Sequence, residues 1–123
     1  MDIKLFELTS EHSYYWSLLG RTTHDTTLLN YYQNGDYYDD HTDNAIFSQI
    51  IFLNKEPKRF TGGNLVFTKF NEIIAPENNS LVIFPSFFSH KVETTYLLEE
   101  NNLNYSYCGF GRISLVTFYT NLE

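Results

Sequence analysis

The strongest constraint on the fold is that the apolar residues come in short, β-rich segments, each bounded by turn residues. The segments are IFSQIIFLN (46–54), NLVFTKF (64–70), SLVIFP (80–85), KVETTYLL (91–98) and RISLVTFYT (112–120). The stretches between them, KEPKRFTGG, APENN and LEENNLN, are rich in Pro, Gly, Asn or charged residues. Short strands at such spacing predict an all-β sandwich or barrel.

One stretch near the N-terminus favours a helix instead. Residues 10–20, SEHSYYWSLLG, offer Ser10 as an N-cap and Gly20 as a stop. We therefore expect at most one or two short helices before the strands. At 123 residues, of which 42% are hydrophobic, the chain can bury one core. We expect a single domain over residues 1–123.

The turn residues predict two hairpins. IIFLN and NLVFT flank a loop that ends in Gly62-Gly63, a pair suited to a turn with positive φ. HKVETTYLL and YSYCGFGRISLVTF flank EENNLN, with a tip near Asn101. Equal counting back along both strands places His90 opposite Arg112, although a bulge at Gly109–Gly111 would shift the register.

Charge and composition exclude several functions. The net charge is −7 and the Lys and Arg residues are scattered, which disfavours nucleic-acid binding by a basic face. One cysteine excludes an internal disulfide and a zinc site of several thiolates. No window approaches the roughly 20 apolar residues that span a bilayer. No basic region followed by an apolar run marks a signal peptide, so we expect a soluble, cytoplasmic protein.

The spacing of His41 and Asp43 indicates a metal site. Residues i and i+2 of a strand point to the same face, so an H-x-D sequence places an imidazole and a carboxylate side by side. His90 opens a later strand and is a better third ligand than His12 or His24, which lie in the less regular N-terminal stretch. Two histidines and one carboxylate leave coordination positions open, which suits Fe(II).

Four sequence stretches together resemble a known family. They are YYQNGDYYDDHTDN, IIFLNKEPKRFTGGNLVF, LVIFPSFFSHKV and GRISLVTF, in that order, and they cover roughly residues 30–120. The chain resembles the prolyl-hydroxylase-like catalytic core of the 2-oxoglutarate- and Fe(II)-dependent oxygenases. This resemblance implies a double-stranded β-helix, a jelly-roll barrel with the metal in its mouth.

The resemblance also implies roles for individual residues. His41, Asp43 and His90 would bind Fe(II). Arg112 and Ser114 would bind the remote carboxylate of the co-substrate 2-oxoglutarate, a task that suits the fork of a guanidinium. Tyr32, with Tyr31 as the alternative, would reach the same co-substrate. Further positions implied are the apolar walls Leu65 and Val92, and Phe52, where some relatives have a tyrosine.

The implied activity is that of a dioxygenase. It would couple the oxidative decarboxylation of 2-oxoglutarate to succinate with the hydroxylation of a peptide or small molecule, a prolyl or other amino-acid residue among the candidates. Dioxygen is the second co-substrate and ascorbate a candidate reductant. Rings at Phe47, Phe52, Phe67, Phe84 and Phe118 would shield the site or simply form the core.

Two departures from the family pattern leave alternatives open. His90 and Arg112 lie 22 positions apart, further than in many relatives, and the N-terminal region is short. The chain is thus either a compact member or part of a longer protein. A cupin-like barrel that binds metal and ligand without oxygenase activity would also account for His41, Asp43 and His90. A barrel that serves only as a binding or structural domain is a further alternative. It would tolerate the loss of any of these three residues, and none is lost here.

Overall fold

The protein is built from antiparallel strands in two facing sheets. The computed structural model describes residues 14–98 and 109–121. One sheet has the order β1-β10-β3-β7 and the other the order β2-β8-β5-β6. The first contains β1 (His24–Tyr32), β10 (Arg112–Thr120), β3 (Phe47–Leu53) and β7 (Ser80–Pro85). The second contains β2 (Tyr38–His41), β8 (His90–Val92), β5 (Leu65–Phe67) and β6 (Glu72–Ile74). A separate pair joins β4 (Phe60–Gly62) to β9 (Thr95–Leu97).

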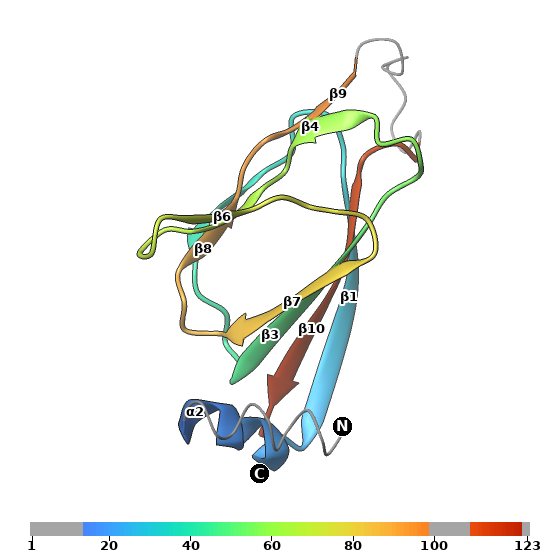
Figure 1. Cartoon of the computed structure of the whole chain (residues 1–123). Helices are drawn as coiled ribbons and strands as arrows, with labels where there is room; N and C mark the ends of the chain where they lie inside the picture. The colour runs from blue at the N-terminus through green and yellow to red at the C-terminus, as the bar shows by residue number, and fades with distance from the viewer. Residues whose placement is uncertain (1–13, 99–108, 122–123) are drawn as a thin grey trace.

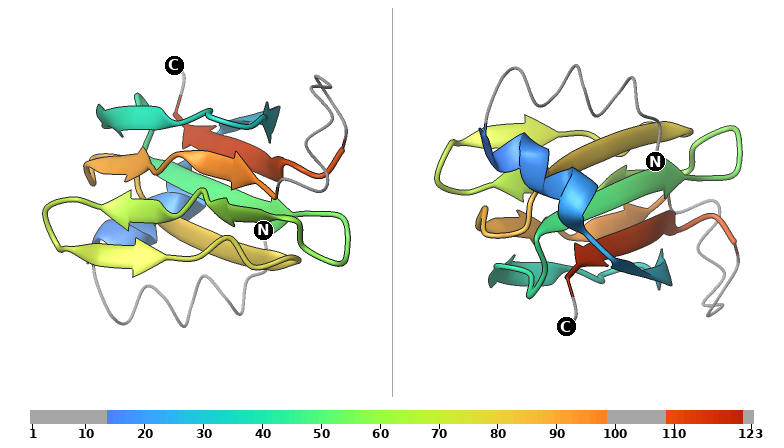
Figure 2. Two further views of the ribbon diagram at one scale, coloured as in Figure 1. Left: turned by 90° about the horizontal axis from the view of Figure 1, so that it is seen from above. Right: turned by 90° about the horizontal axis from the view of Figure 1, so that it is seen from below.

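The chain winds back and forth between the two sheets. Strands β1, β3, β7 and β10 belong to one sheet, and the strands between them in sequence belong to the other sheet or to the β4–β9 pair. Figures 1 and 2 show the resulting layers, with the two sheets lying face to face. This winding is that of a double-stranded β-helix, so the predicted all-β fold is confirmed.

Buried and less buried side chains alternate along the strands, and the buried ones form the core between the two sheets. In β3, Phe47, Ser48, Ile50 and Phe52 are buried, and the residues between the last three are less so. Side chains from both sheets meet in the core, because every second residue of a strand points to the same face. The buried cluster consists of Ile50, Phe52, Leu65, Phe67, Phe84 and Val92.

Both predicted hairpins are wrong. The strand IIFLN, in β3, pairs with β10 and β7, while the β5 strand that follows the Gly62-Gly63 turn pairs with β6 and β8. The two glycines do adopt positive φ, 72° and 68°. His90 is paired with His41 and Phe67, whereas Arg112 is paired with Tyr32. A β-helix sends successive strands to opposite sheets, so counting back from a loop gives the wrong partner. The predicted tip at Asn101 lies outside the described residues.

The N-terminal stretch that predicts a helix, residues 10–20, is helical from Tyr14 onward in the part that the structure describes. Helix α2 (Tyr14–Ser17) continues into the 3-10 helix η1 (Leu18–Arg21), which includes Gly20, while Ser10 lies outside the described residues. Figure 1 places α2 at the end of the molecule where β1 begins and β10 ends. Trp16 stacks on Phe47 with ring centroids 4.9 Å apart, and the Tyr15 hydroxyl donates to the Ile46 carbonyl at 2.6 Å. These contacts fasten the helix to the start of β3.

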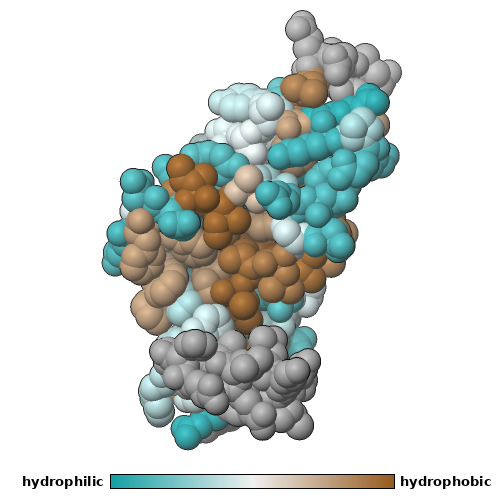
Figure 3. Space-filling model, viewed as in Figure 1, coloured by the Kyte–Doolittle hydropathy of each residue, from teal (hydrophilic) through white to brown (hydrophobic). Residues whose placement is uncertain are grey.

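Apolar side chains are also exposed on the face seen in Figure 3, where β6 and β7 run. Ile73 on β6 and Leu81 on β7 are each more than half exposed. Both strands are the last in their sheets, so these residues lie at the edges and not in the core between the layers. Among the helices of residues 14–98 and 109–121, none has the length and apolar character to cross a bilayer.

Candidate functional site

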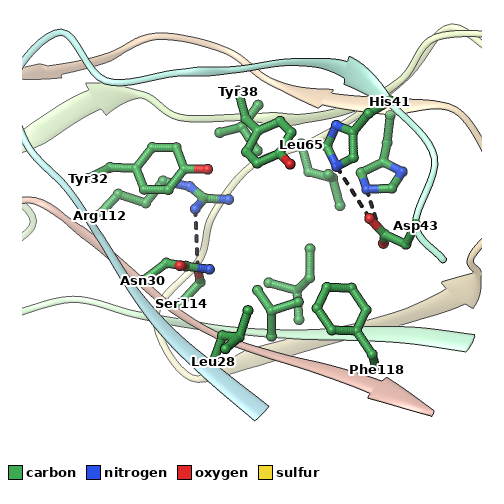
Figure 4. Close-up of a pocket in the computed structure, with 14 residues that line it drawn as sticks. Leu28, Asn30, Tyr32, Tyr38, His41, Asp43, Leu65, Arg112, Ser114 and Phe118 are labelled. Atoms are coloured by element: carbon green, nitrogen blue, oxygen red, sulfur yellow. Dashed lines mark hydrogen bonds and ion pairs between the residues drawn. The ribbon is translucent and has the colours of Figure 1, made fainter. Parts of the chain in front are cut away.

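A cavity between the two sheets collects most of the residues that the sequence singled out. Its volume is about 150 Å³. Figure 4 shows two polar groups of side chains in it, one around Asp43 and one around Arg112, with apolar residues between them. The lining residues are Leu28, Asn30, Tyr32, Tyr38, His41, Asp43, Ile50, Leu65, His90, Val92, Arg112, Ser114, Val116 and Phe118.

At one end of the cavity, His41, Asp43 and His90 form a cluster with the composition of a metal site. One ligand atom from each lies within 4.8 Å of the other two. The Nε2 atoms of His41 and His90 are 3.3 and 3.4 Å from the two carboxylate oxygens of Asp43. His90 comes from β8 and His41 from the end of β2, directly opposite it in register. The predicted triad is therefore brought together, although its members are far apart in sequence.

The backbone fixes the orientation of both imidazoles. The Nδ1 atom of His41 lies 2.6 Å from the Asp39 carbonyl, and that of His90 lies 2.7 Å from the Phe88 carbonyl. A carbonyl only accepts, so each Nδ1 carries the proton and each Nε2 presents its lone pair when the ring is neutral. In both histidines, a hydrogen bond from Nδ1 to the backbone carbonyl two residues earlier turns Nε2 toward Asp43.

Asp43 is held by a small network of its own. The Ser48 hydroxyl donates to Asp43 Oδ2 at 2.5 Å and contacts the Ser86 hydroxyl at 2.8 Å, and the Asp43 amide donates to the Ser86 carbonyl. Burial raises the pKa of Asp43, but its interactions with His90, Ser48 and His41 outweigh burial and the net pKa is lowered. The carboxylate is thus kept ionised and its rotation restricted, as a metal ligand requires.

At the other polar group, Arg112 is buried with one nitrogen unpaired. Its side chain is 2% exposed. Nε donates to the Gly63 carbonyl at 2.8 Å, Nη1 makes a long contact of 3.4 Å with Ser114 Oγ, and Nη2 has no hydrogen-bond partner. None of the ion pairs among the described side chains involves this arginine. Burial lowers the pKa of Arg112 to about 10, so the guanidinium remains charged at neutral pH.

Aromatic rings complete the surroundings of that guanidinium. Its central carbon lies 4.8 Å from the centroid of the Tyr32 ring and 5.2 Å from that of Phe52. Such cation–π contacts partly replace the water lost on burial, but they leave the donor Nη2 without an acceptor. A buried cation with a free donor, facing a cavity, is suited to bind an anion.

The two tyrosines of the predicted pair lie in different places. Tyr32 lines the cavity beside Arg112, its direct partner in the β1–β10 register. The Tyr31 hydroxyl instead accepts hydrogen bonds from the amides of Gly109 and Gly111, at 3.0 and 3.1 Å. Neighbouring residues of a strand point to opposite faces, so only one of the two can enter the cavity.

Several other predictions can be placed. Leu65 and Val92 line the cavity as expected, and so does Phe118, whereas the other predicted aromatic walls are buried in the core beside it. His24 lies at the start of β1, its Nδ1 2.7 Å from Thr23 Oγ1, and is not among the residues that line the cavity. His12 lies outside the described residues.

Sequence reasoning missed three residues on the β1 and β2 side of the cavity. Leu28 and Asn30 precede Tyr32 on β1 by four and two positions, and their period of two is the signal that could have found them. Tyr38 packs against the His41 ring in a tilted arrangement, with ring centroids 3.9 Å apart. The pairing register of β2 with β8 shifts between Tyr38 and His41, and these two rings lie on the same side, which no regular alternation predicts.

Comparison with known proteins identifies the family of the chain. The sequence profile of the 2OG-Fe(II) oxygenase superfamily matches residues 26–120. The chain belongs to this superfamily. A prolyl-4-hydroxylase from Pseudomonas putida is similar in structure, with a TM-score of 0.61 and 22% identity over 83% of this chain and 54% of that protein. No curated protein is similar enough in sequence to match.

A second oxygenase structure gives a similar result. A 2OG-Fe(II) oxygenase family oxidoreductase from Burkholderia pseudomallei has a TM-score of 0.59 and 22% identity, over 76% of this chain and 41% of that protein. The chain therefore spans about half the length of these solved oxygenases or less. At this level of identity, the two structures support the fold of the oxygenase domain.

The residues present fit the groups that the oxygenase superfamily uses, Fe(II) and 2-oxoglutarate. Two imidazoles and a carboxylate form the donor set expected for a non-haem Fe(II) centre with open positions. The buried Nη2 of Arg112 has no hydrogen-bond acceptor, and a carboxylate of 2-oxoglutarate would supply one. Both observations concern residues of this chain and neither depends on the comparisons.

Proposed function

We propose that this protein is an Fe(II)- and 2-oxoglutarate-dependent dioxygenase that hydroxylates an amino-acid residue. Overall, the substrate, 2-oxoglutarate and dioxygen would be converted into the hydroxylated substrate, succinate and CO₂. One observation carries the proposal: a single cavity of about 150 Å³ is lined both by the His41–Asp43–His90 cluster and by a buried arginine with an unpaired donor. We also propose that residues 1–123 form one oxygenase domain.

The residues of this chain would bind the metal and orient its ligand atoms. His41, Asp43 and His90 would hold the metal, and the Nδ1–H bonds to backbone carbonyls keep both Nε2 atoms turned toward Asp43. Fe(II), when bound, supplies the oxygen activation that no side chain here can perform. Asp43 contributes a negative charge, because the lowered pKa of its carboxyl group keeps that group ionised at neutral pH.

The other polar group would receive the remote carboxylate of 2-oxoglutarate. Arg112 offers Nη2, and Ser114 faces the same side two residues further along β10. The protein carries a net charge of −7, so general electrostatics oppose binding of a dianion, and a specific buried cation must supply the attraction. Tyr32 and the apolar side chains between the two ends, such as Leu65 and Val116, would exclude water.

The size of the cavity bears on the substrate. Pockets that enclose a drug-sized molecule measure roughly 300–1,000 Å³. A cavity of about 150 Å³ suits a small co-substrate and the reactive group of a larger molecule that stays outside. An amino-acid residue in a peptide fits this description, and proline is the first residue to test, since one similar structure is a prolyl-4-hydroxylase.

The test is uncoupled turnover. The purified protein is incubated with Fe(II), ascorbate as reductant, 2-oxoglutarate and dioxygen, and succinate is measured with and without proline-containing peptides. We expect slow succinate release that depends on oxygen and is lost in His90→Ala. Tight binding of divalent metal with no succinate under any condition would instead favour the cupin-like barrel without oxygenase activity.

A further inference from the structure

Two buried side-chain atoms in residues 14–98 and 109–121 lack a hydrogen-bond partner: Arg112 Nη2 and Thr95 Oγ1. Unsatisfied buried polar atoms are uncommon in folded proteins, and each one needs an explanation. The proposed function supplies an acceptor for Arg112. It gives no role to Thr95, whose residue is completely buried.

Both orphaned side chains approach the same glycine, Gly63. Arg112 Nε donates to the Gly63 carbonyl at 2.8 Å. A Cβ atom added to Gly63 would lie 2.7 Å from Arg112 Cδ and 3.0 Å from Thr95 Oγ1. The hydroxyl of Thr95 and the side chain of Arg112 thus both lie close to Gly63, a residue that has no side chain.

The backbone of Thr95 is held in place by hydrogen bonds on both sides. Its amide donates to the Asp36 carbonyl at 2.9 Å and its carbonyl accepts from the Gly35 amide at 2.7 Å, while β4 pairs with it through Gly62. The position is therefore rigid. Valine has the same shape and would fill the site without an unsatisfied polar atom, so packing alone does not account for threonine here.

We propose that Thr95 is a positioning residue for the remote carboxylate of the bound dicarboxylate, a role that rests on the proposed function. The hydroxyl does not line the cavity, so it would act through an ordered water shared with Arg112 Nη2 and the carboxylate. In this arrangement one ligand group satisfies both orphaned atoms. Thr95 thereby adds to the preference for a 2-oxo acid with a second carboxylate.

The experiment measures ligand affinity and thermal stability in the full chain loaded with Mn(II), which binds such sites without turnover. Thr95→Val should weaken 2-oxoglutarate binding about ten-fold, the effect of one lost hydrogen bond to a charged group. Binding of 2-oxopentanoate, which has the same length but no second carboxylate, should be unchanged. Thr95→Ser, which keeps the hydroxyl, should bind 2-oxoglutarate like the wild type.

Stability should move in the opposite direction to affinity. Thr95→Val removes an unsatisfied hydroxyl, so the ligand-free protein should melt at a higher temperature. Thr117 is a matched control, since it is also buried but its hydroxyl bonds to that of Thr27 at 2.9 Å. Thr117→Val should therefore lower the melting temperature and leave 2-oxoglutarate affinity unchanged.

Three outcomes would overturn the inference, and they are distinguishable. Equal 2-oxoglutarate affinity in the wild type and Thr95→Val would remove Thr95 from carboxylate recognition while the proposed function stands. An equal loss of 2-oxopentanoate binding would mean that the substitution distorts the cavity in general. Failure of the wild-type protein to bind 2-oxoglutarate at all would remove the proposed function together with the inference.

Discussion

His41 and His90 are direct partners across the antiparallel strands β2 and β8, and both turn Nε2 toward the carboxylate of Asp43. Their ring centroids are 4.3 Å apart. Cross-strand partners have closely spaced Cβ atoms, so this pairing determines the separation of the two imidazoles. The backbone then sets their orientation through the carbonyls of Asp39 and Phe88. The positions of the two imidazoles are therefore a property of the sheet. Asp43 lies just beyond the end of β2, so the predicted H-x-D pair does not sit within one strand.

The first prediction concerns the support of Asp43. Ser48→Ala removes the hydroxyl that donates to Asp43 Oδ2. Losing such a support typically lowers metal affinity 10- to 100-fold, so we expect about ten-fold weaker Mn(II) binding by calorimetry. Ser80→Ala is the control, because its hydroxyl bonds only to the Glu77 carbonyl on the surface. Unchanged Mn(II) affinity in Ser48→Ala would contradict a metal-ligand role for Asp43.

The second prediction concerns pH. Burial lowers the pKa of His90, but its contacts with Asp43 outweigh burial and the net pKa is raised. Its stabilising contribution in metal-free protein is therefore complete below about pH 6.5 and is lost as pH rises through the raised pKa. Asp43 also stabilises the folded protein, because its pKa is lowered on folding. This contribution is lost in acidic solution, as pH falls through the lowered pKa.

Metal-free protein should accordingly be most stable in mildly acidic solution. Mn(II) competes with the proton on His90, so the rise in melting temperature on adding Mn(II) should grow with pH. Melting curves from about pH 5 to about pH 8.5, with and without Mn(II), measure both trends. A metal-induced rise that is the same at every pH would argue against two-histidine ligation.

The third prediction is that replacing Arg112 changes protein stability and 2-oxoglutarate affinity in opposite directions. Arg112→Met replaces a buried, unpaired cation by an apolar side chain of similar length, so the ligand-free protein should become more stable. Affinity for 2-oxoglutarate should fall by roughly ten-fold to a few hundred-fold, the worth of a desolvated charge-assisted pair. Arg112→Lys should recover only part of that loss, because an ammonium keeps the charge but not the fork.

Metal affinity provides the control for these variants. Arg112 lies at the other polar group of the cavity, so Mn(II) binding should be nearly unchanged in both. A stabilised Arg112→Met protein that still binds 2-oxoglutarate as the wild type does would show that the arginine is not part of the co-substrate site.

The fourth prediction tests the close approach at Gly63. Gly63→Ala would place a Cβ atom 2.7 Å from Arg112 Cδ, at a residue whose φ is 68°. We expect lower stability and weaker 2-oxoglutarate binding, because the arginine must shift. Gly35→Ala has φ of 91° but no atom within 4 Å, so it should lower stability through backbone strain alone. If both variants bind 2-oxoglutarate equally well, the approach of Gly63 to Arg112 has no bearing on the site.

The fifth prediction separates the two tyrosines. Tyr32→Phe removes a hydroxyl from the cavity and should weaken 2-oxoglutarate binding by several-fold, with little effect on stability. Tyr31→Phe removes the acceptor for the amides of Gly109 and Gly111, so it should lower the melting temperature and leave affinity largely intact. The reverse pattern would assign the co-substrate contact to Tyr31.

Much of this protein could be predicted from local patterns in the sequence. The segments SLVIFP and RISLVTFYT coincide with β7 and β10, because bounded β-rich runs carry their own signal. The H-x-D spacing and a distant histidine indicated the cluster around Asp43. The pairing of the strands could not be predicted, because it depends on how the whole chain winds between two sheets. Both hairpins inferred from nearby turns were therefore wrong.

The sequence by itself determined the all-β class, the identity of the metal-binding candidates and the need for a local cation on an acidic protein. The tertiary structure alone decided that His90 faces His41, that Arg112 faces Tyr32, and that Tyr31 turns away from the cavity. It also left Thr95 and Arg112 each with one buried atom unpaired. The physical reason is that side-chain identity fixes which bonds a residue can make, whereas register and burial decide which of those bonds are made.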